Sequence, residues 1–352
     1  MQSRSFQVSH LPLYSLSLSH PSEYFVAGAD HIPHLLSLST SSFRNPTKSV
    51  PLKVIHRTPK SKLHSHSDWI TNCNYSSTHN VYITSGMDGQ IITWDSSLTA
   101  TNMLLYQGPI SKLSLVNNSM ISASYDGSIF IYNLKGHTLE RSYSLKLSVP
   151  VLDALLINQS TLLAADKAGT ITISKLDNKL QSSIKAHIGP IPKIIFEDCL
   201  IYSIGKGDGY LRCFDDRLPL TKGRRIKNQY LFEGGISDFI ILRNDLIFVV
   251  GGGDGTCILT NGVQIIHTFH TTNNTQLSIV ALTPYSILQI SDTMVAVGWG
   301  NGDISLCNIA TLTQTRIKTS CKNAIRCLVV DEHSLVAAGD DGLLIAIDLM
   351  SV

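Results

Sequence analysis

The sequence predicts an all-β fold in which one short unit is repeated, and three observations support this prediction. An alternating apolar run, a Gly-rich acidic turn and a second alternating run recur seven times, as in VYITSGMDGQIITWD at residues 81–95. The residue seven positions after the turn acid or its equivalent is Asp or Asn in six of the seven units. The turn glycines lie 38 to 47 residues apart, at Gly89, Gly127, Gly169, Gly209, Gly255, Gly302 and Gly342. Their mean interval of about 42 residues is typical of a propeller blade.

Each unit is predicted to contribute four antiparallel strands. Alternation on both sides of an Asp-Gly or Asn-Gly turn indicates a hairpin, because Gly accepts the positive φ that such a turn requires. The apolar run before a hairpin, such as residues 108–116, supplies one more strand, and the segment after it, such as residues 178–187, supplies the fourth. Four short antiparallel strands, repeated in this way, predict a closed β-propeller.

The order of the units favours eight blades within a single domain, residues 1–352. A weaker unit at residues 13–39 lacks the Asp-Gly turn, and the seven clear units follow it. The final unit stops at its third strand, near Asp348, so we expect a strand around Phe6–Val8 to complete it and leave no open sheet edge. Seven blades are the alternative if the first unit is irregular.

The composition limits the classes of partner. The chain is 43% hydrophobic and 15% charged, with a formal net charge of +2, so it lacks the overall basic excess expected of a nucleic-acid or membrane-surface protein. Seven Cys without a Cys-x-x-Cys pair indicate a reducing compartment. No apolar run is long enough to span a bilayer, and the N-terminus does not look like a signal peptide. We therefore expect a protein of the cytoplasm and/or nucleus with no membrane association.

The repeats resemble those of the WD-repeat family, whose unit ends in Trp-Asp, intact here at Trp94-Asp95. In that family a His, a Ser or Thr, the turn Asp and the Trp form a structural hydrogen-bonded tetrad. The resemblance assigns these roles to His66, Ser85 (or Thr84), Asp88 and Trp94, and it makes His187 with Asp208 a partial match. It covers nearly the whole chain and is specific for fold, whereas it does not specify a function.

The motifs do not indicate catalysis, a metal or a cofactor. Strands flank the glycine clusters at residues 205–209 and 251–255 on both sides, which favours hairpin turns over a phosphate-binding loop at a helix N-terminus. His64 with His66, and His31 with His34, lack the further ligands of a zinc site. The repeated turn acids follow the structural period. We therefore predict a non-catalytic protein without a cofactor or a small-molecule substrate, with an unrecognised hydrolase as the alternative.

The leading functional prediction is a scaffold that binds other proteins within an intracellular complex. The hairpin turns should surround one face of the disc, and exposed aromatic side chains on a rigid ring are typical anchors of protein interfaces. Trp299, between two glycines, is the sharpest candidate, with a ring folded onto the next blade as the alternative. The candidate interaction face comprises Trp69, Met87, Tyr125, Lys167, Lys206, Trp299 and Asp340.

Two further features suggest alternative functions. The predicted inter-strand loop at residues 41–66 contains prolines and basic residues but no acid before Ser67, which suits RNA phosphates, as in an assembly factor for ribosome biogenesis. A solvated loop is the simpler interpretation. The segment Phe214-Asp215-Asp216-Arg217 resembles the Trp-Asp-x-Arg box by which some WD-repeat proteins serve as substrate receptors of cullin-RING ubiquitin ligases, with an ordinary strand end as the alternative. The basic residues of the loop are Arg44, Lys48, Lys53, Arg57, Lys60 and Lys62.

Overall fold

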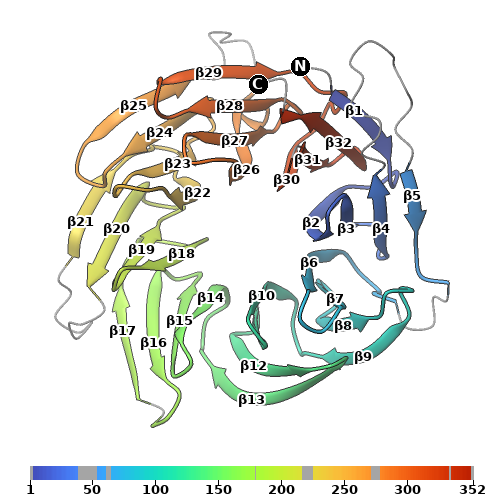
Figure 1. Cartoon of the computed structure of the whole chain (residues 1–352). Helices are drawn as coiled ribbons and strands as arrows, with labels where there is room; N and C mark the ends of the chain where they lie inside the picture. The colour runs from blue at the N-terminus through green and yellow to red at the C-terminus, as the bar shows by residue number, and fades with distance from the viewer. Residues whose placement is uncertain are drawn as a thin grey trace.

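The computed structural model describes residues 3–38, 54–60, 65–178, 180–215, 225–270, 278–332 and 334–349. Within these residues the strands form eight four-stranded antiparallel sheets, and Figure 1 shows them arranged as blades around a ring. The prediction of an eight-bladed propeller is confirmed, and the seven-bladed alternative is wrong. The weak first unit is a complete blade because its strands pair as the others do, although its turn lacks the Asp-Gly.

The first four blades follow the chain in order. Blade 1 contains β2 (Leu13–His20), β3 (Glu23–Gly28), β4 (Pro33–Leu38) and β5 (Val54–Arg57). Blade 2 contains β6 (Ile70–Ser76), β7 (Val81–Gly86), β8 (Gln90–Trp94) and β9 (Ala100–Leu105). Blade 3 contains β10 (Ile110–Val116), β11 (Ser119–Ser124), β12 (Ser128–Lys135) and β13 (Thr138–Lys146). Blade 4 contains β14 (Val151–Asn158), β15 (Thr161–Asp166), β16 (Thr170–Lys175) and β17 (Gln181–Lys185).

The remaining blades complete the ring. Blade 5 contains β18 (Ile194–Glu197), β19 (Leu200–Ile204), β20 (Tyr210–Asp215) and β21 (Arg225–Tyr230). Blade 6 contains β22 (Ile236–Ile241), β23 (Ile247–Gly251), β24 (Thr256–Thr260) and β25 (Ile265–His270). A short helix, α1 (Ile279–Leu282), precedes blade 7, which contains β26 (Pro284–Gln289), β27 (Met294–Trp299), β28 (Ile304–Asn308) and β29 (Thr313–Ile317). Blade 8 contains β30 (Ile325–Asp331), β31 (Ser334–Gly339), β32 (Leu343–Asp348) and β1 (Ser3–Gln7).

The two ends of the chain meet in blade 8, as Figure 1 shows. Strand β1 pairs antiparallel with β32 along its whole length, from Ser3 opposite Ile347 to Gln7 opposite Leu343. The N-terminal strand is therefore the outer strand of the blade whose other three strands come from the C-terminus. This pairing covers the edge of β32 that would otherwise be left open.

The hydrophobic core lies between the blades. Strand β7 is buried along its whole length, since neighbouring blades cover both faces of the sheet, whereas the outer strand β9 alternates between half-buried and exposed residues. Each of the eight core clusters joins two successive blades, and one of them packs Leu13 and Val26 of blade 1 against Val336 and Leu344 of blade 8. Each blade thus depends on both neighbours for the burial of its apolar side chains.

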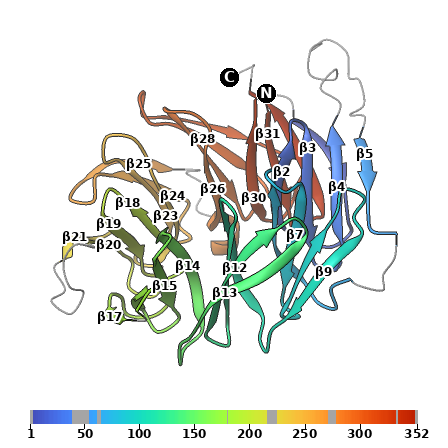
Figure 2. The ribbon, with the colours of Figure 1, turned by 60° about the horizontal axis from the view of Figure 1, so that its bottom comes forward.

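The two faces of the disc carry different connections, and the tilted view in Figure 2 shows strands running between them. The turns between the second and third strands of each blade and the connections between successive blades lie on one face, which we call the turn face. The other connections lie on the opposite face. In the described part of the chain, no helix has the length and apolar character needed to cross a membrane.

The predicted basic loop at residues 41–66 is only partly a loop. Val54–Arg57 form β5, the outer strand of blade 1, which pairs with β4. Arg57 donates a hydrogen bond to Glu23 over 2.7 Å and is thereby tied to its own blade. The sequence analysis missed this strand because the first unit lacks the turn that marks the others. Residues 41–53 and 61–64, which include Arg44, Lys48, Lys53 and Lys62, lie outside the described residues.

Candidate functional site

Blade 2 contains the structural tetrad, with one correction. His66 Nδ1 lies 3.0 Å from Asp88, His66 Nε2 lies 2.8 Å from Thr84 Oγ1, and Trp94 Nε1 donates to the same hydroxyl over 2.8 Å. The tetrad hydroxyl therefore belongs to Thr84, the alternative given in the sequence analysis, and the first choice, Ser85, is wrong. Successive side chains of a strand point to opposite faces of the sheet, so Ser85 faces away and its buried hydroxyl has no partner among the described residues.

The directions of these hydrogen bonds follow from the donor inventory. An indole N–H can only donate, so Thr84 accepts from Trp94. The Asp88 carboxylate can only accept, so His66 Nδ1 carries a proton toward it, and in the neutral ring Nε2 accepts the hydrogen of Thr84. Both carboxylate oxygens of Asp88 are used by blade 2, because they also accept from the backbone N–H groups of Ser67 and Gln90.

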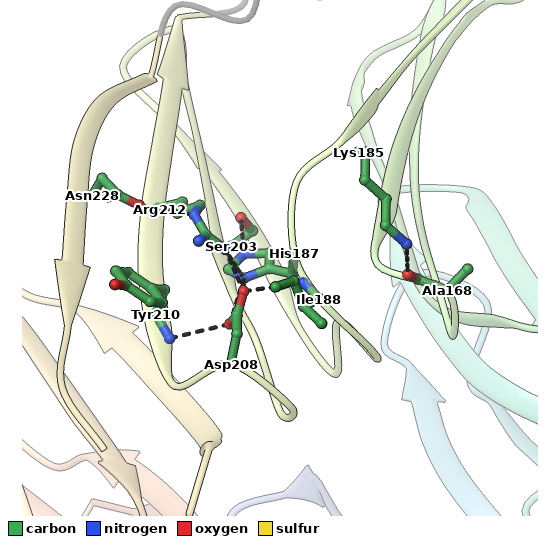
Figure 3. Close-up of polar contacts among 9 residues, drawn as sticks. All are labelled: Ala168, Lys185, His187, Ile188, Ser203, Asp208, Tyr210, Arg212 and Asn228. Carbon is green, nitrogen blue, oxygen red and sulfur yellow. Dashed lines mark hydrogen bonds and ion pairs between the residues drawn. The ribbon is translucent and has the colours of Figure 1, made fainter. Parts of the chain in front are cut away.

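Blade 5 holds a variant of the tetrad in which Phe214 occupies the Trp position. Figure 3 shows its other members, His187, Ser203 and Asp208. His187 Nε2 lies 2.9 Å from Ser203 Oγ, and its Nδ1 lies 3.0 Å from Asp208. The buried side chain of Arg212 approaches both groups, with Nη1 2.5 Å from Asp208 Oδ2 and 2.7 Å from His187 Nδ1. A guanidinium can only donate and a carboxylate can only accept, so the tautomer of His187 decides which of these two groups its Nδ1 bonds.

Arg212 is held rigidly from its other sides. Its Nε donates to Asn228 Oδ1 over 2.8 Å, and the guanidinium lies 4.4 Å from the centre of the Tyr210 ring. Partial burial alone would raise the pKa of Asp208, but hydrogen bonds from Arg212, the Ile188 backbone and His187 lower it to about 2. This buried ion pair is therefore a structural feature of the blade.

Trp299 is not an exposed anchor, which corrects the sharpest prediction of the sequence analysis. It is the last residue of β27, with 1% of its surface exposed, and it packs with Phe248 and Val250 of blade 6. Its indole N–H donates to Ser305 over 2.9 Å. The strand continues one residue further than the flanking glycines suggested, so the ring points between the blades.

A cluster of one exposed and four half-buried side chains gathers on the turn face, where the innermost strands begin. Trp69 lies beside Tyr14, with ring centres 5.6 Å apart. The Arg326 guanidinium lies 6.0 Å from the Tyr14 ring and 4.3 Å from the Tyr285 ring, and it binds Asp340 through two hydrogen bonds of 2.7 Å each. We call these five residues, which come from blades 2, 1, 8 and 7, the mouth cluster.

A repeated irregularity of the innermost strands positions this cluster. In blade 1, Leu13 and Ser15 pair with Gly28 and Ala27, so Tyr14 is an extra residue without a partner across the ladder. Such a β-bulge re-aims the side chain of the extra residue. Seven blades have the bulge at this register, and the extra residues are Tyr14, Thr71, Ser111, Leu152, Ser237, Tyr285 and Arg326.

Electrostatics keep the mouth cluster in one state near neutral pH. Partial burial, together with the Asp340 carboxylate, raises the pKa of Tyr14, so its hydroxyl stays protonated. Hydrogen bonds to Asp340 raise the pKa of Arg326. In the salt bridge each carboxylate oxygen of Asp340 accepts one hydrogen bond from Arg326, while the two tyrosine hydroxyls and the indole N–H of Trp69 have no hydrogen-bond partner among the described residues.

The remaining predicted site residues are more scattered. Met87, Tyr125, Lys167 and Lys206 all lie in turns of the turn face, and Tyr125 is 42% exposed. Met87 adjoins the mouth cluster, because its backbone N–H donates to the Trp69 carbonyl over 2.8 Å. Sequence reasoning therefore found Trp69 and Asp340 and missed Tyr14, Tyr285 and Arg326. The signal for these three was their shared position directly after the first buried residue of each innermost strand. In the candidate adaptor box, Phe214 is buried, Asp215 ends β20, and Asp216 and Arg217 lie outside the described residues.

A groove on the opposite face offers little chemistry. It has a volume of about 750 Å³ and lies between blades 3 and 4, with Asn158, Gln159 and Leu176 in its lining. Its titratable lining side chains are Tyr143 and Asp177, which do not form a nucleophile with an adjacent base. Within the described ranges, no three His, Cys, Asp or Glu residues are grouped so that they could hold a metal ion.

Comparisons with known proteins agree with this geometry. Residues 57–95, which include the complete tetrad, match the WD40 family model, described as "WD domain, G-beta repeat". Sqt1 of Saccharomyces cerevisiae is similar in structure, with 13% identity, coverage of 98% of each chain and a TM-score of 0.79. The C-terminal WD40 domain of Sif2 gives 14% identity, 98% coverage of each chain and a TM-score of 0.76. Sqt1 of Chaetomium thermophilum, bound to the N-terminus of the ribosomal protein L10, gives 12% identity, coverage of 98% of each chain and a TM-score of 0.78.

The fold and the tetrad together define an eight-bladed β-propeller. More particularly, it is a propeller with a WD40 repeat at residues 57–95, similar in fold to known WD40 propellers.

Proposed function

We propose that the chain is a non-catalytic scaffold of the cytoplasm or nucleus, which binds a partner protein through the mouth cluster on its turn face. The observation that carries the proposal is a row of aromatic rings at the surface of a rigid base, in which Trp69 is exposed and Tyr14 and Tyr285 are half-buried. Trp69 is 48% exposed. A chain of ring contacts runs from Trp69 through Tyr14 and Arg326 to Tyr285, across four blades. Large, rigid aromatic and Arg side chains are the groups that dominate binding energy at protein interfaces.

Further exposed apolar groups on the same face support this proposal. The two most exposed residues of α1 are Ile279 and Val280, and the Val280 backbone lies against Gly300, close to the Tyr285 ring. Helix α1 therefore extends the mouth cluster toward blade 6. Of the solved propellers with this fold, Sqt1 holds the N-terminus of a ribosomal protein, which is a precedent for a propeller that captures a protein segment.

Affinity purification with mass spectrometry, from the cells that make this protein, tests the proposal. The variant Trp69→Ala/Tyr285→Ala should lose at least one partner that the wild type retains, by about tenfold or more, because two anchors are removed. The matched control is Leu180→Ala/Val263→Ala, which truncates two exposed apolar side chains of the opposite face. If both variants retain all partners, or lose the same ones, the binding face has been wrongly assigned.

The RNA-proximal and ubiquitin-ligase alternatives lack a supporting observation among the described residues. Arg57 is engaged by Glu23, and Arg217 lies outside the described part. They would gain support if neutral replacements of the six basic residues abolished a salt-dependent RNA interaction, or if Arg217→Ala abolished recovery of a ligase adaptor.

A further inference from the structure

The outer strand of each blade has one edge that no described strand covers, and most of these strands carry a charged side chain. An uncovered strand edge can pair with another chain, and charged residues on the strand oppose such pairing. Six of the eight outer strands, β1, β5, β13, β17, β21 and β29, contain Lys, Arg or Glu. The other two, β9 (ATNMLL) and β25 (IIHTFH), contain no Lys, Arg, Asp or Glu. These two edges therefore lack the usual protection by charge.

Of these two strands, β9 has the more regular and more apolar edge. Its side chains alternate between half-buried and exposed, and Met103 and Leu105 are 48% and 74% exposed. The bulge in its ladder with β8 lies at Thr101, before these two residues. In β25 the exposed apolar residues are Ile265 and Ile266, which lie at its bulge, and a bulge twists an edge away from pairing. The edge of β9 is therefore the better template for another strand.

The backbone groups of the exposed residues of β9 point away from the blade. The Tyr106 N–H donates to the Gly89 carbonyl over 2.9 Å, and Leu105 lies opposite Gln90 in the ladder. In an antiparallel pair, residues that hydrogen-bond across the ladder alternate with residues that do not. Leu105, and with it Met103, therefore directs its N–H and C=O away from β8. The same two positions thus offer an exposed apolar side chain and uncovered backbone groups.

We propose that a second copy of the chain pairs antiparallel with this edge, so that two β9 strands join blade 2 of each copy into one sheet. Figure 1 shows β9 on the outer side of its blade, where a second chain can approach. The two-fold axis passes beside Leu104, which places Met103 opposite Leu105 of the second copy, and Leu105 opposite Met103 of that copy. This register aligns the outward backbone groups for about four hydrogen bonds and brings the exposed apolar side chains together on one face.

A second copy suits this edge because self-pairing brings no like charges together. An outer strand that carries Lys or Arg would place equal charges close to one another if it paired with its own copy, which is destabilising. The two-fold contact uses the same edge of both copies, so association ends at a dimer. Because only one short strand of each copy takes part, we expect a Kd on the order of 10–100 µM and a monomer at lower concentrations. The mouth cluster contains no residue of β9, so the inference is independent of the proposed function.

Sedimentation equilibrium of the full chain, between about 1 and 200 µM, tests this proposal. The weight-average mass should rise from that of one chain toward that of two chains and no further. A mass that stays at one chain over the whole range would overturn the proposal, and so would a mass that keeps rising beyond two chains.

The variant Leu105→Lys adds the charge that the edge lacks, at an exposed position where the fold is retained. It should weaken association by at least about tenfold, because each symmetric contact then contains a charge that loses water. Val263→Lys is the matched control, since Val263 is also 74% exposed but lies in the connection between β24 and β25. It should associate as the wild type does. Equal association by Leu105→Lys, or equal weakening by Val263→Lys, would overturn the assignment to β9.

A second variant tests the backbone pairing and its register. Leu105→Pro removes an outward N–H and leaves the ladder with β8 intact, so it should prevent the dimer with little change in the thermal midpoint. In Met103→Cys/Leu105→Cys, mild oxidation should link position 103 of one copy to position 105 of the other, because directly opposed residues have the spacing that a disulfide requires. Peptide mapping by mass spectrometry identifies the link, with the oxidised wild type as the control. A dimer that is retained by Leu105→Pro, or that forms without this link, would contradict the proposed pairing.

Discussion

At the scale of single residues, two adjacent hydroxyls of one strand differ in their hydrogen bonding. Thr84 satisfies both Trp94 and His66, whereas the next hydroxyl, that of Ser85, is buried without a partner. Sequence spacing placed a hydroxyl near position 85 but could not choose between them, because the choice depends on which face of the sheet meets the next blade. The same ambiguity between the two faces of a strand led to the wrong prediction that Trp299 is exposed.

Replacing Thr84 should therefore be far more damaging than replacing Ser85. Thr84→Val preserves the shape but leaves His66 Nε2 and Trp94 Nε1 buried without partners, which should lower the free energy of unfolding by about 2–4 kcal/mol. Ser85→Ala removes an unpartnered hydroxyl and should change it by less than about 0.5 kcal/mol. Urea unfolding of the two variants measures the difference, and equal losses would contradict the revised tetrad.

The Asp208–Arg212 pair should make the stability of blade 5 depend on pH. The pKa of Asp208 is lowered from 3.8 to about 2 in the folded chain, so its contribution is complete above about pH 4 and is lost as the pH falls toward 2. After allowance for solvent screening, the contribution is on the order of 1–2 kcal/mol. Arg212→Met should therefore be destabilised at pH 7, and its deficit relative to the wild type should shrink between pH 4 and pH 2 in urea titrations. A deficit that is independent of pH would contradict this account.

At the scale of elements, the β-bulge in the innermost strand is the feature that turns a repeat into a binding surface. It occupies the same register in seven blades, and an aromatic ring or a guanidinium stands there in blades 1, 7 and 8. These blades are consecutive around the ring because β1 joins the two ends of the chain. Tyr14 and Arg326 are more than 300 positions apart in the sequence and become neighbours through this closure.

The closing strand should be essential both for the thermal stability of the ring and for preventing oligomers. A chain that lacks residues 1–7 exposes the edge of β32, so we expect the thermal midpoint to fall by about 5 °C or more and oligomers to form through the open edge. Size-exclusion chromatography and circular dichroism would measure both effects. Addition of a synthetic peptide of residues 1–9 should reverse them, and a truncated chain that remains monomeric and equally stable would contradict the expectation.

At the scale of the whole molecule, the apolar core belongs to pairs of blades. All eight clusters join neighbours, so the loss of one blade would expose apolar surface on two others. In a closed ring every blade, including the first and the last, packs against two neighbours. We therefore expect a single cooperative unit rather than a chain that frays from its ends.

Tryptophan fluorescence can test this cooperativity, because Trp94 lies in blade 2 and Trp299 in blade 7. In the variants Trp69→Phe/Trp299→Phe and Trp69→Phe/Trp94→Phe, one buried tryptophan reports on one side of the ring. Both fluorescence transitions in urea should coincide with the loss of circular dichroism in the same variant. Separate midpoints would show that the blades unfold in stages.

The sequence by itself determined the repeating unit, the hairpin in each unit and the favoured number of blades, because these depend on short-range alternation and turn chemistry. Only the tertiary structure decided which face of each strand meets its neighbour, and so selected Thr84 over Ser85 and buried Trp299. It also decided that Tyr14, Trp69, Tyr285 and Arg326 meet on one surface. Their contact depends on ring closure and on bulges that shift the side-chain period by one residue, and neither is encoded in local spacing.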